Sequence, residues 1–469
     1  MLEFFKINDP IRIIGALLIL LAIRLPLILG GIDITLPEIG WMTLGEALAN
    51  GKKMYLDVWD NTGPLAAGIY WILFNIGGKS QWLMQLLSIL LVMHQAYIFN
   101  RTLLRNNIYN QKNYIPAVLY VIFMCMSFDF LTLPPVLIAL SFLLQVLRSV
   151  IRLDNRSLDQ EVFSIGAWTG VATLIYIPSI FFLAMAILSL ASFRISSIRK
   201  LFLAIYGFVL VIVFYMSYPF FNDGLQEFLN QYVYSYFSLP TVKYITLPEI
   251  IRLCIAPGIF LTLAIFRTFT DRNFVNFQVS CQQIMLIWVA TAAAAVFFSV
   301  DLAPYQLILF VPALSFFGTH FLLIQRRKLF AELTFLVSSG AIVALMYLSY
   351  HRSIPSDSFV DYKNYIATED QIGKAIKGKK LLVLGEDISY YKNNTLATKY
   401  YNWDLSQKHL SKLNNYAIIS AVYKEFEKDI PEVIIDQHGL AEQLFIHAPI
   451  LAEKYVKDPN LNGVYKLKN

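Results

Sequence analysis

Long apolar runs, separated by short clusters of charge, constrain this chain more than any other feature of its sequence. A helix needs roughly 20 mostly apolar residues to cross the hydrocarbon core of a bilayer, and apolar runs recur from residue 11 to residue 349. The composition agrees, because 57% of the residues are hydrophobic and 15% are charged. Soluble domains have about 45–50% apolar and about 25% charged residues. We therefore expect an all-α polytopic membrane protein.

Eleven transmembrane helices are predicted from these runs. They cover residues 11–30, 81–100, 114–128, 131–147, 162–176, 178–193, 201–220, 248–267, 282–300, 304–324 and 331–349. The stretches 114–147 and 162–193 are each too long for one span, and Asp129 and Pro178 interrupt them, so we divide them there. The first run is long for the apolar region of a signal peptide, and we interpret it as a retained span. Arg24, inside that run, either snorkels to the interface or pairs with a carboxylate.

The basic residues of the loops predict the orientation. With the N-terminus in the cytoplasm, the outside loops carry four of them, Lys52, Lys53, Lys79 and Lys243. The inside segments carry sixteen: Lys6, Arg12, Arg101, Arg105, Lys112, Arg148, Arg152, Arg156, Arg194, Arg199, Lys200, Arg267, Arg272, Arg326, Arg327 and Lys328. This positive-inside bias, with an odd number of spans, predicts an extracytoplasmic C-terminal part. The net charge of +6 then reflects membrane orientation and contact with lipids, and it does not indicate a nucleic-acid partner.

The chain changes character near Tyr350. Residues 351–469 are polar and rich in Lys and Asn, with short apolar runs at 380–385 and 431–436 that are typical of buried strands. Residues 455–466 predict a hairpin or strand pair, and helices are expected near 407–428 and 440–453. The predicted domains are a transmembrane helical domain over 1–350 and a small α/β extracytoplasmic domain over 351–469.

The first outer loop, residues 31–64, is the first candidate for chemistry. It is long for a loop between spans and contains Asp33, Glu38, Asp57 and Asp60 together with aromatic residues, glycine and proline. Residues 42–50 predict a surface helix, residues 65–77 predict an apolar element too short to span, and Asp60 begins a predicted turn. Irregular backbone at membrane depth needs hydrogen-bond partners, so we expect this loop to pack on helices or to line a cavity.

Asp129 is the second candidate, because it is the only acid between Tyr114 and Gln145. The predicted topology places it at the outer ends of two spans, on the same side as the acidic loop. It either faces interfacial water without a role or is a functional carboxylate facing a cavity. The three cysteines lie in or beside apolar runs without metal-ligand spacing, and we interpret them as packed side chains: Cys125, Cys254 and Cys281.

In their order, these features resemble the GT-C-type membrane glycosyltransferases, the group that contains protein O-mannosyltransferases and lipid A aminoarabinose transferases. Glu38, after Pro37, stands where that family has an acid pair. Asp129 stands between the third and fourth spans, where the family has its second acidic position. Three further passages resemble family motifs: Gly51 to Leu65 for "G-x-x-x-Y-x-D … P-L", Gly170 to Pro178 for "GLA…K-x-P", and Phe298 to Ala313 for "FS…YxLPxxPAL". The likeness covers roughly residues 20–325, and Tyr176 and Asp301 replace basic residues of the family.

The resemblance implies transfer of a sugar from a polyprenyl-phosphate-linked donor to an extracytoplasmic glycan, lipid or protein acceptor. One carboxylate then acts as general base, with Glu38 as the first candidate and Asp33 and Asp129 as the second. The leaving phosphate needs cations or a divalent metal nearby. The candidate cations are Lys52, Lys53, Lys243 and Arg252, whereas no motif in the sequence provides a ligand set for a metal.

Two other functions remain open at this point. The replaced family residues favour a non-catalytic assembly or scaffold protein of the cell envelope, built on the same fold. A transporter of lipid-linked glycans is the other alternative, although such proteins show internal repeats and this sequence shows none. The resemblance and the charge pattern together imply a bacterial inner membrane.

Overall fold

A computed structural model describes residues 1–153, 159–192, 197–238, 242–271, 274–350, 360–362, 364–368 and 371–468. Three basic residues used to predict the orientation, Arg156, Arg194 and Arg272, lie outside these residues, as does the predicted start of the C-terminal domain. The chain divides into two compact units that interleave along the sequence. Unit 1 comprises Met1–Ile32, Met84–Tyr215 and Val242–Tyr362, and unit 2 comprises Asp33–Leu83, Met216–Thr241 and Lys363–Asn469.

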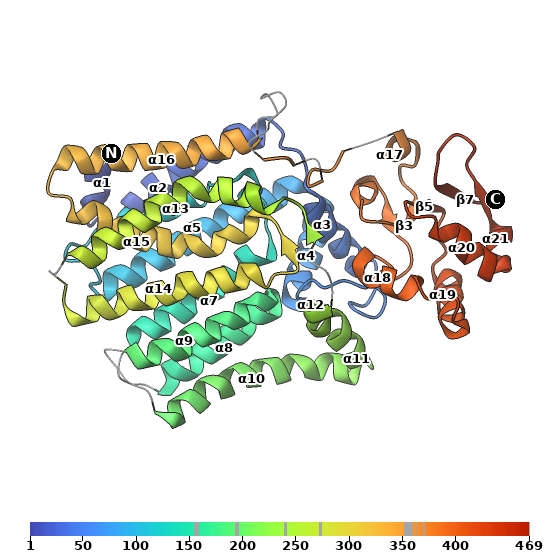
Figure 1. Cartoon of the computed structure of the whole chain (residues 1–469), viewed down its shortest axis with the longest axis horizontal. Helices are drawn as coiled ribbons and strands as arrows, with labels where there is room; N and C mark the ends of the chain where they lie inside the picture. The colour runs from blue at the N-terminus through green and yellow to red at the C-terminus, as the bar shows by residue number, and fades with distance from the viewer. Residues whose placement is uncertain are drawn as a thin grey trace. The chain divides into compact units, whose positions relative to one another are not determined.

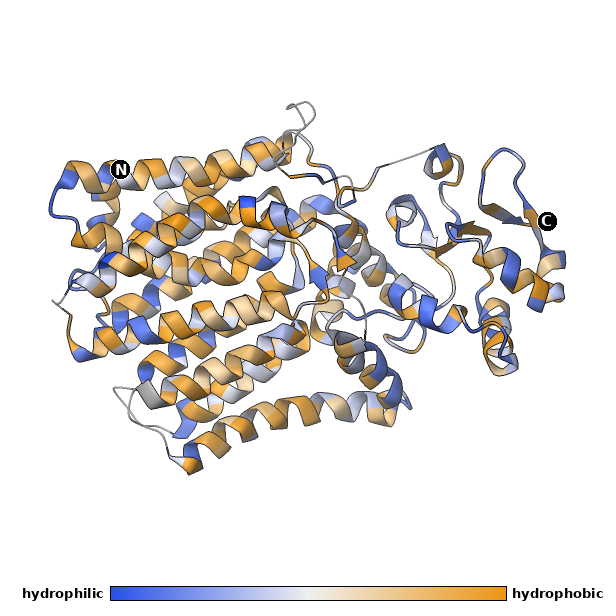
Figure 2. Ribbon diagram, in the orientation of Figure 1, coloured by the Kyte–Doolittle hydropathy of each residue, from blue (hydrophilic) through white to orange (hydrophobic). Residues whose placement is uncertain are grey.

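Unit 1 is a bundle of helices that run side by side (Figure 1), and most of their residues are hydrophobic (Figure 2). The part of the chain that the structure describes contains eight helices long and apolar enough to cross a membrane. They are α2 (Arg12–Leu29), α5 (Gln81–Arg105), α7 (Pro135–Arg152), α10 (Ile198–Phe221), α13 (Leu247–Thr270), α14 (Asn276–Phe297), η4 (Pro304–Phe310) continued by α15 (Val311–Ile324), and α16 (Lys328–Tyr350). Helices α5 and α10 each continue into unit 2.

Three of the eleven predicted spans coincide with shorter helices. These are α6 (Ile115–Phe123), α8 (Asp159–Ile175), and η2 (Ile177–Ile180) followed by α9 (Phe181–Ser192). The total of eleven therefore stays a prediction. The two predicted interruptions are confirmed, because the 3₁₀ turn η1 (Phe128–Leu131) separates α6 from α7 and η2 separates α8 from α9.

Glycines bring α8 and α10 into close contact within unit 1. A Cβ added to Gly166 would lie 1.8 Å from the carbonyl oxygen of Ala204, and one added to Gly207 would lie 2.4 Å from that of Phe163. Small residues four positions apart, such as Gly166 and Gly170, let helix backbones approach closely in membranes. Only 11% of the apolar window of α10 is buried inside the protein, so the opposite face of α10 is expected to contact lipid.

Unit 2 combines segments that are far apart in the sequence. The first loop supplies α3 (Leu36–Ala49) and α4 (Pro64–Gly77), and the middle of the chain supplies α11 (Leu225–Phe228), the π-helical turn η3 (Leu229–Tyr234) and α12 (Ser235–Ser238). The predicted surface helix therefore begins earlier than residue 42. The C-terminal segment adds α17 (Gln371–Ala375), η5 (Ser389–Asn393), α18 (Trp403–Leu410), α19 (Tyr416–Lys428), α20 (Leu440–His447) and α21 (Pro449–Lys454).

The C-terminal segment also contains a five-stranded sheet with the order β4–β3–β5–β7–β6. Its strands are β3 (Lys380–Leu384), β4 (Thr395–Leu396), β5 (Val433–Asp436), β6 (Tyr455–Lys457) and β7 (Val464–Leu467). Strand β3 pairs in parallel with β4 and β5, whereas β7 is antiparallel to β5 and β6. The predicted strands and terminal hairpin are thus confirmed, and so is the fold class, an all-α polytopic membrane protein with a small C-terminal α/β region. The predicted domain boundary at residue 350 stays a prediction.

Candidate active site

Glu38 lies in the first turn of α3, where several local features fix its position. The Oγ1 atom of Thr35 caps the helix by accepting the N–H of Glu38 at 3.3 Å. Pro37 suits this turn because its missing N–H would have no helical partner there. The start of α3 is anchored by Leu36, whose N–H donates to the carbonyl oxygen of Tyr365 at 2.8 Å. The side chain of Glu38 is only 1% exposed, so it is a buried carboxylate on a rigid helix.

The neighbours of Glu38 come from α4 and from the start of α5. Gln81 donates from Nε2 to Oε2 of Glu38 at 3.2 Å. Helices α3 and α4 pack closely, since a Cβ on Gly45 would lie 2.4 Å from the carbonyl oxygen of Tyr70. Burial raises the pKa of Tyr70 well above its usual value, and the negative charges of Asp60 and Glu38 add to this rise. Tyr70 therefore stays a neutral phenol close to two carboxylates, with its ring stacked on Trp41 at a centroid distance of 5.8 Å.

Asp60 forms the predicted turn and is also part of this cluster. Its Oδ1 accepts the N–H of Asn61 at 2.8 Å, and its Oδ2 accepts the hydroxyl of Thr62 at 2.7 Å. Burial raises the pKa of Asp60, while hydrogen bonds from Thr62, Asn61 and Asn402 oppose the rise. Asp33, by contrast, is exposed. Unit 2 thus brings Glu38, Asp60 and Tyr70 together, and Tyr70 was missed because it lies within an apolar run that carries no polar signal.

Lys52 and Lys53, both predicted to bind the donor phosphate, have different surroundings. An ammonium group has three N–H donors, and Lys52 directs its Nζ to Asp429 Oδ2 (2.8 Å) and to the carbonyl oxygens of Leu396 (2.9 Å) and Thr398 (3.3 Å). These contacts use all three donors and hold the first loop on the C-terminal sheet. Lys53 keeps its side chain exposed.

Lys79, in the turn before α5, also holds the parts of unit 2 together. Its Nζ forms an ion pair with Glu46 Oε2 at 2.7 Å and donates to the carbonyl oxygens of Tyr391 and Asn394, both at 2.7 Å. Burial lowers the pKa of Lys79, and the nearby carboxylate of Glu46 opposes this effect. Lys52 and Lys79 therefore stabilise the internal structure of unit 2.

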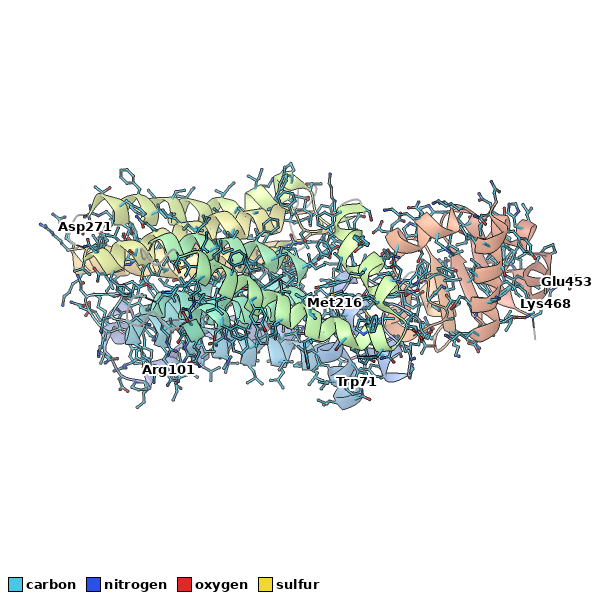
Figure 3. All side chains as sticks on the ribbon, turned by 90° about the horizontal axis from the view of Figure 1, so that it is seen from below. Trp71, Arg101, Met216, Asp271, Glu453 and Lys468 are labelled. Atoms are coloured by element: carbon cyan, nitrogen blue, oxygen red, sulfur yellow. The ribbon has the colours of Figure 1, made fainter. Side chains whose placement is uncertain are left out.

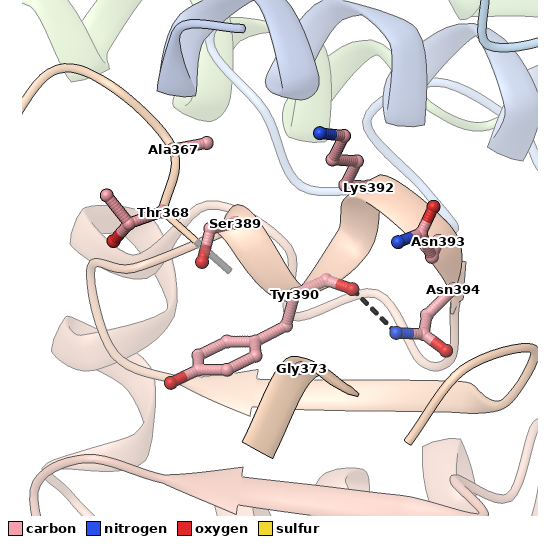
Figure 4. Close-up of a pocket in the computed structure, with 8 residues that line it drawn as sticks. All are labelled: Ala367, Thr368, Gly373, Ser389, Tyr390, Lys392, Asn393 and Asn394. Atoms are coloured by element: carbon pink, nitrogen blue, oxygen red, sulfur yellow. Dashed lines mark hydrogen bonds between the residues drawn. The ribbon is translucent and has the colours of Figure 1, made fainter. Parts of the chain in front are cut away.

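A small polar pocket lies in the C-terminal part of unit 2 (Figure 4). In it, Asn394 donates from Nδ2 to the carbonyl oxygen of Tyr390 at 2.7 Å. Its volume of about 20 Å³ exceeds the ~10–15 Å³ that one water molecule needs. The pocket is therefore the size of a water site and is too small to hold a sugar.

Asp129 belongs to unit 1, where it lies in the buried break between α6 and α7 and is 1% exposed. Arg24 of α2 stabilises this break: Nη2 donates to the carbonyl oxygens of Met124 (2.7 Å) and Phe130 (3.1 Å), and Nη1 donates to Ser88 Oγ (3.0 Å). Carbonyl groups at a helix end have no hydrogen-bond donor within the helix. At membrane depth, water cannot supply the missing donor. Arg24 is fully buried, so it does not snorkel to the interface.

The two positions where the family has basic residues meet in unit 1 through one polar network. The hydroxyl of Tyr176 donates to Ser299 Oγ at 3.2 Å, and the hydroxyl of Tyr305 donates to Asp301 Oδ2 at 3.2 Å. Gln306 joins the two pairs, because its Nε2 donates to Ser299 Oγ and to the carbonyl oxygen of Asp301. The sequence shows each replacement but not their convergence.

Two predicted phosphate ligands lie in unit 1, and both are exposed. Lys243 is on β1 (Val242–Lys243), which pairs in parallel with β2 (Asp301–Leu302), so its backbone lies opposite Leu302 and next to the network of Asp301. Arg252 is on the second turn of α13, near the carboxylate of Glu249. Lys243 is therefore the candidate cation beside the site where the family would place its own.

An apolar groove of about 310 Å³ lies between helices of unit 1. It is lined by side chains from α6, α13 and α16: Phe123, Ala256, Ile259, Phe260, Leu263, Leu333, Thr334, Val337, Ser338, Ala341 and Ile342. Within the described ranges, no group of three or more His, Cys, Asp or Glu residues could hold a metal ion.

No family model and no curated protein matches this chain. Among solved structures, it is similar to ArnT from Cupriavidus metallidurans bound to undecaprenyl phosphate, with a TM-score of 0.53 and 11% identity over 71% of this chain and 63% of that chain. It is also similar to the archaeal oligosaccharyltransferase AglB from Archaeoglobus fulgidus, in complex with an inhibitory peptide and a dolichol-phosphate, with a TM-score of 0.51 and 12% identity over 97% and 74% of the two chains. This chain has the GT-C fold.

The GT-C fold agrees with the family resemblance of the sequence. The oligosaccharyltransferase of Archaeoglobus fulgidus in its apo form gives a TM-score of 0.50 at 11% identity, so the match does not depend on a bound ligand. The chain spans 63% of the length of the ArnT structure. At such low identity, the likeness concerns the path of the backbone, and the roles of individual residues rest on their own surroundings.

Proposed function

We propose that this GT-C protein is a membrane glycosyltransferase that moves a sugar from a polyprenyl-phosphate-linked donor to an extracytoplasmic acceptor. The observation that carries the proposal is Glu38, a buried carboxylate fixed in the first turn of the first helix after the first candidate span. The family resemblance expects a catalytic acid at this place in the sequence. Two of the structures with the same fold hold lipid phosphates, undecaprenyl phosphate and dolichol-phosphate.

In the proposed reaction, Glu38 is the general base. It takes the proton of an acceptor hydroxyl while the acceptor oxygen forms a bond to the anomeric carbon of the sugar. The bond between that carbon and the phosphate oxygen breaks, and polyprenyl phosphate leaves with the electron pair. Base and leaving group lie on opposite faces of the sugar in such a displacement. Proton transfer by a positioned group contributes about 10²–10⁴-fold to the rate, and Gln81 orients the Glu38 carboxylate through its hydrogen bond.

The leaving phosphate requires positive charge. Lys53, Lys243 and Arg252 are exposed and are our candidates, whereas Lys52 has all three donors engaged within unit 2. Asp33 and Asp129 remain secondary candidates, for orienting the acceptor or the base. The apolar groove between α13 and α16 is suited to the isoprenoid chain of the donor, since its lining is almost entirely hydrocarbon.

The proposal includes an orientation in the bacterial inner membrane. The N-terminus is cytoplasmic, and the first loop and the C-terminal α/β domain lie outside, as the distribution of basic residues predicts. This arrangement would place Glu38 on the extracytoplasmic side, where the acceptor is. Accessibility labelling of single-cysteine variants, one in the loop 31–64 and one in the loop after α5, tests the orientation directly.

The substitution Glu38→Gln tests the function. It keeps the side-chain shape and removes the base, so cells carrying it are expected to lose one envelope sugar, as measured by glycan profiling at matched protein levels. Glu46→Gln in the same helix is the matched control, because Glu46 pairs with Lys79 and has no proposed part in transfer. If Glu38→Gln cells keep a wild-type glycan profile while deletion of the protein changes it, the catalytic proposal is wrong.

A non-catalytic scaffold on the GT-C fold is the second candidate. The network of Tyr176, Ser299 and Asp301 favours it, because a hydroxyl and an acid stand where the family has cations. Under this alternative, Tyr176→Phe would impair assembly of a complex and Glu38→Gln would not. Co-purification of envelope proteins with each variant distinguishes the two functions.

A further inference from the structure

Four arginines surround a single pocket at the ends of α5 and α7. Arg101 and Arg105 lie in the last turns of α5, and Arg148 and Arg152 lie in the last turns of α7. Together with Ile98, Thr102 and Asn106, they line a space of about 140 Å³. This is about ten times the ~10–15 Å³ that a single water requires, so the pocket has room for a phosphate group.

The pocket keeps an excess of positive charge. Within the described residues, Arg152 is the only one of the four that forms an ion pair, with Glu161 at 3.3 Å. Arg101 bonds the hydroxyl of Tyr97 (3.2 Å), and Arg148 bonds the amide oxygen of Gln145 (3.1 Å), both neutral groups. Among the residues that the structure describes here, four arginines and one glutamate give +3, and the two helix C-termini offset roughly 1 unit of this charge. These described groups therefore leave about two positive charges for a ligand.

The positive-inside rule explains why arginines are frequent at this end of the helices, but it does not explain why four of them line one cavity. The ends of α5 and α7 lie close together because both line the pocket, and Gln95 links the two helices further from these ends, donating from Nε2 to the carbonyl oxygen of Leu137 (2.7 Å) and to Ser141 Oγ (2.8 Å). Like charges confined in this way repel one another, at a cost in stability. An anion in the pocket would relieve that cost.

The location identifies the source of the anion. Helices α5 and α7 are both candidate membrane spans, so their ends lie at the depth of lipid headgroups. Figure 3 shows Arg101 toward the same end of unit 1 as Asp271, which follows α13. Both positions lie in segments that the charge pattern places in the cytoplasm. Basic pockets between transmembrane helices on that side are suited to anionic phospholipid headgroups.

We propose that Arg101, Arg105, Arg148 and Arg152 form a binding site for the phosphate headgroup of an anionic phospholipid. Arginine suits this role because its planar guanidinium donates two parallel hydrogen bonds to phosphate oxygens. The doubly charged headgroup of cardiolipin matches the two remaining positive charges better than the single charge of phosphatidylglycerol. The site is distinct from Glu38 and does not depend on the proposed transferase activity.

Native mass spectrometry of the full chain in detergent tests this proposal. Wild-type protein is titrated with cardiolipin, with phosphatidylglycerol and with phosphatidylcholine, and the same titrations are made on the double variant Arg101→Gln, Arg148→Gln. Removing two of the charges is expected to weaken cardiolipin binding about 30-fold, with phosphatidylcholine binding unchanged. The matched control is Arg326→Gln, Arg327→Gln, which removes two exposed arginines from another loop and is expected to bind cardiolipin like the wild type.

Two results would overturn the proposal. One is equal binding of cardiolipin by wild type and by the pocket variant, provided that both elute as folded monodisperse protein. The other is displacement of cardiolipin from the wild type by millimolar inorganic phosphate, because the site would then be one for a free anion. The single variants Arg105→Gln and Arg152→Gln serve as replacements if the double variant does not fold.

Discussion

The substitution Arg24→Leu tests quantitatively how the break between α6 and α7 is stabilised. The guanidinium of Arg24 donates to two carbonyl oxygens and one hydroxyl, at 2.7, 3.1 and 3.0 Å, in a site with no exposed surface. In Arg24→Leu, the carbonyl oxygen of Met124 loses the guanidinium donor, while that of Phe130 keeps a weak bond from Ser88 Oγ at 3.4 Å. An orphaned buried acceptor costs about 1–3 kcal/mol.

Two weakened acceptors, less the desolvation cost that the buried charge no longer imposes, therefore give a net destabilisation of about 3 kcal/mol. About 3 kcal/mol corresponds to roughly 100-fold in the opening equilibrium of the break that carries Asp129. The stability of Arg24→Lys should fall between that of the wild type and that of Arg24→Leu, because an ammonium group is a compact donor without the planar fork of arginine.

Thiol labelling of Cys125 reports this opening. Cys125 is fully buried in the break and bonds the carbonyl oxygen of Val121 at 3.5 Å. In a Cys254→Ser background, Arg24→Leu is expected to speed labelling of Cys125 by a membrane-permeable reagent about 100-fold, while Cys281 in α14 stays slow. Arg267→Leu, at an exposed arginine near the end of α13, is the control. Unchanged labelling and unchanged thermal stability in Arg24→Leu would refute this account of the break.

Two further predictions concern helix packing and the loop anchor. Gly166→Leu should destabilise the protein by more than about 3 kcal/mol, because its Cβ would overlap the carbonyl oxygen of Ala204. Gly258→Leu, with nothing within 4 Å of its Cβ position, should leave the thermal unfolding in detergent nearly unchanged, and equal effects would contradict the packing argument. Burial acts to raise the pKa of Asp429, but hydrogen bonds and charges from Lys52 and Lys380 lower it overall. The unfolded state then binds more protons just below pH 4, so the stability from Asp429 is present above that pH and is lost as the pH falls through the folded pKa. Asp429→Asn should therefore lower the melting temperature at pH 7 and flatten its acid dependence, and an unaltered pH profile would argue against the pairing.

Much of the fold was predictable because its determinants are local. The apolar runs alone indicate the helices, and the polar or proline interruptions at Asp129 and Pro178 coincide with the two 3₁₀ turns. The strands at 380–384 and 433–436 follow from short apolar runs next to turn residues. The surface helix was predicted too short, although Thr35 at the N-cap and Glu38 three residues later form a usual helix-start pattern.

The sequence by itself determined that this chain inserts its helices into a membrane, since transfer of each apolar run depends on composition alone. It also singled out Asp129 as the lone acid of an apolar stretch, while the family resemblance pointed to Glu38. Only the tertiary structure decided that Lys52 is engaged by Asp429, that Arg24 stabilises the break beside Asp129, and that four arginines line one pocket. These arrangements join residues tens to hundreds of positions apart, and no local pattern records which distant side chain will supply a charge or a hydrogen bond.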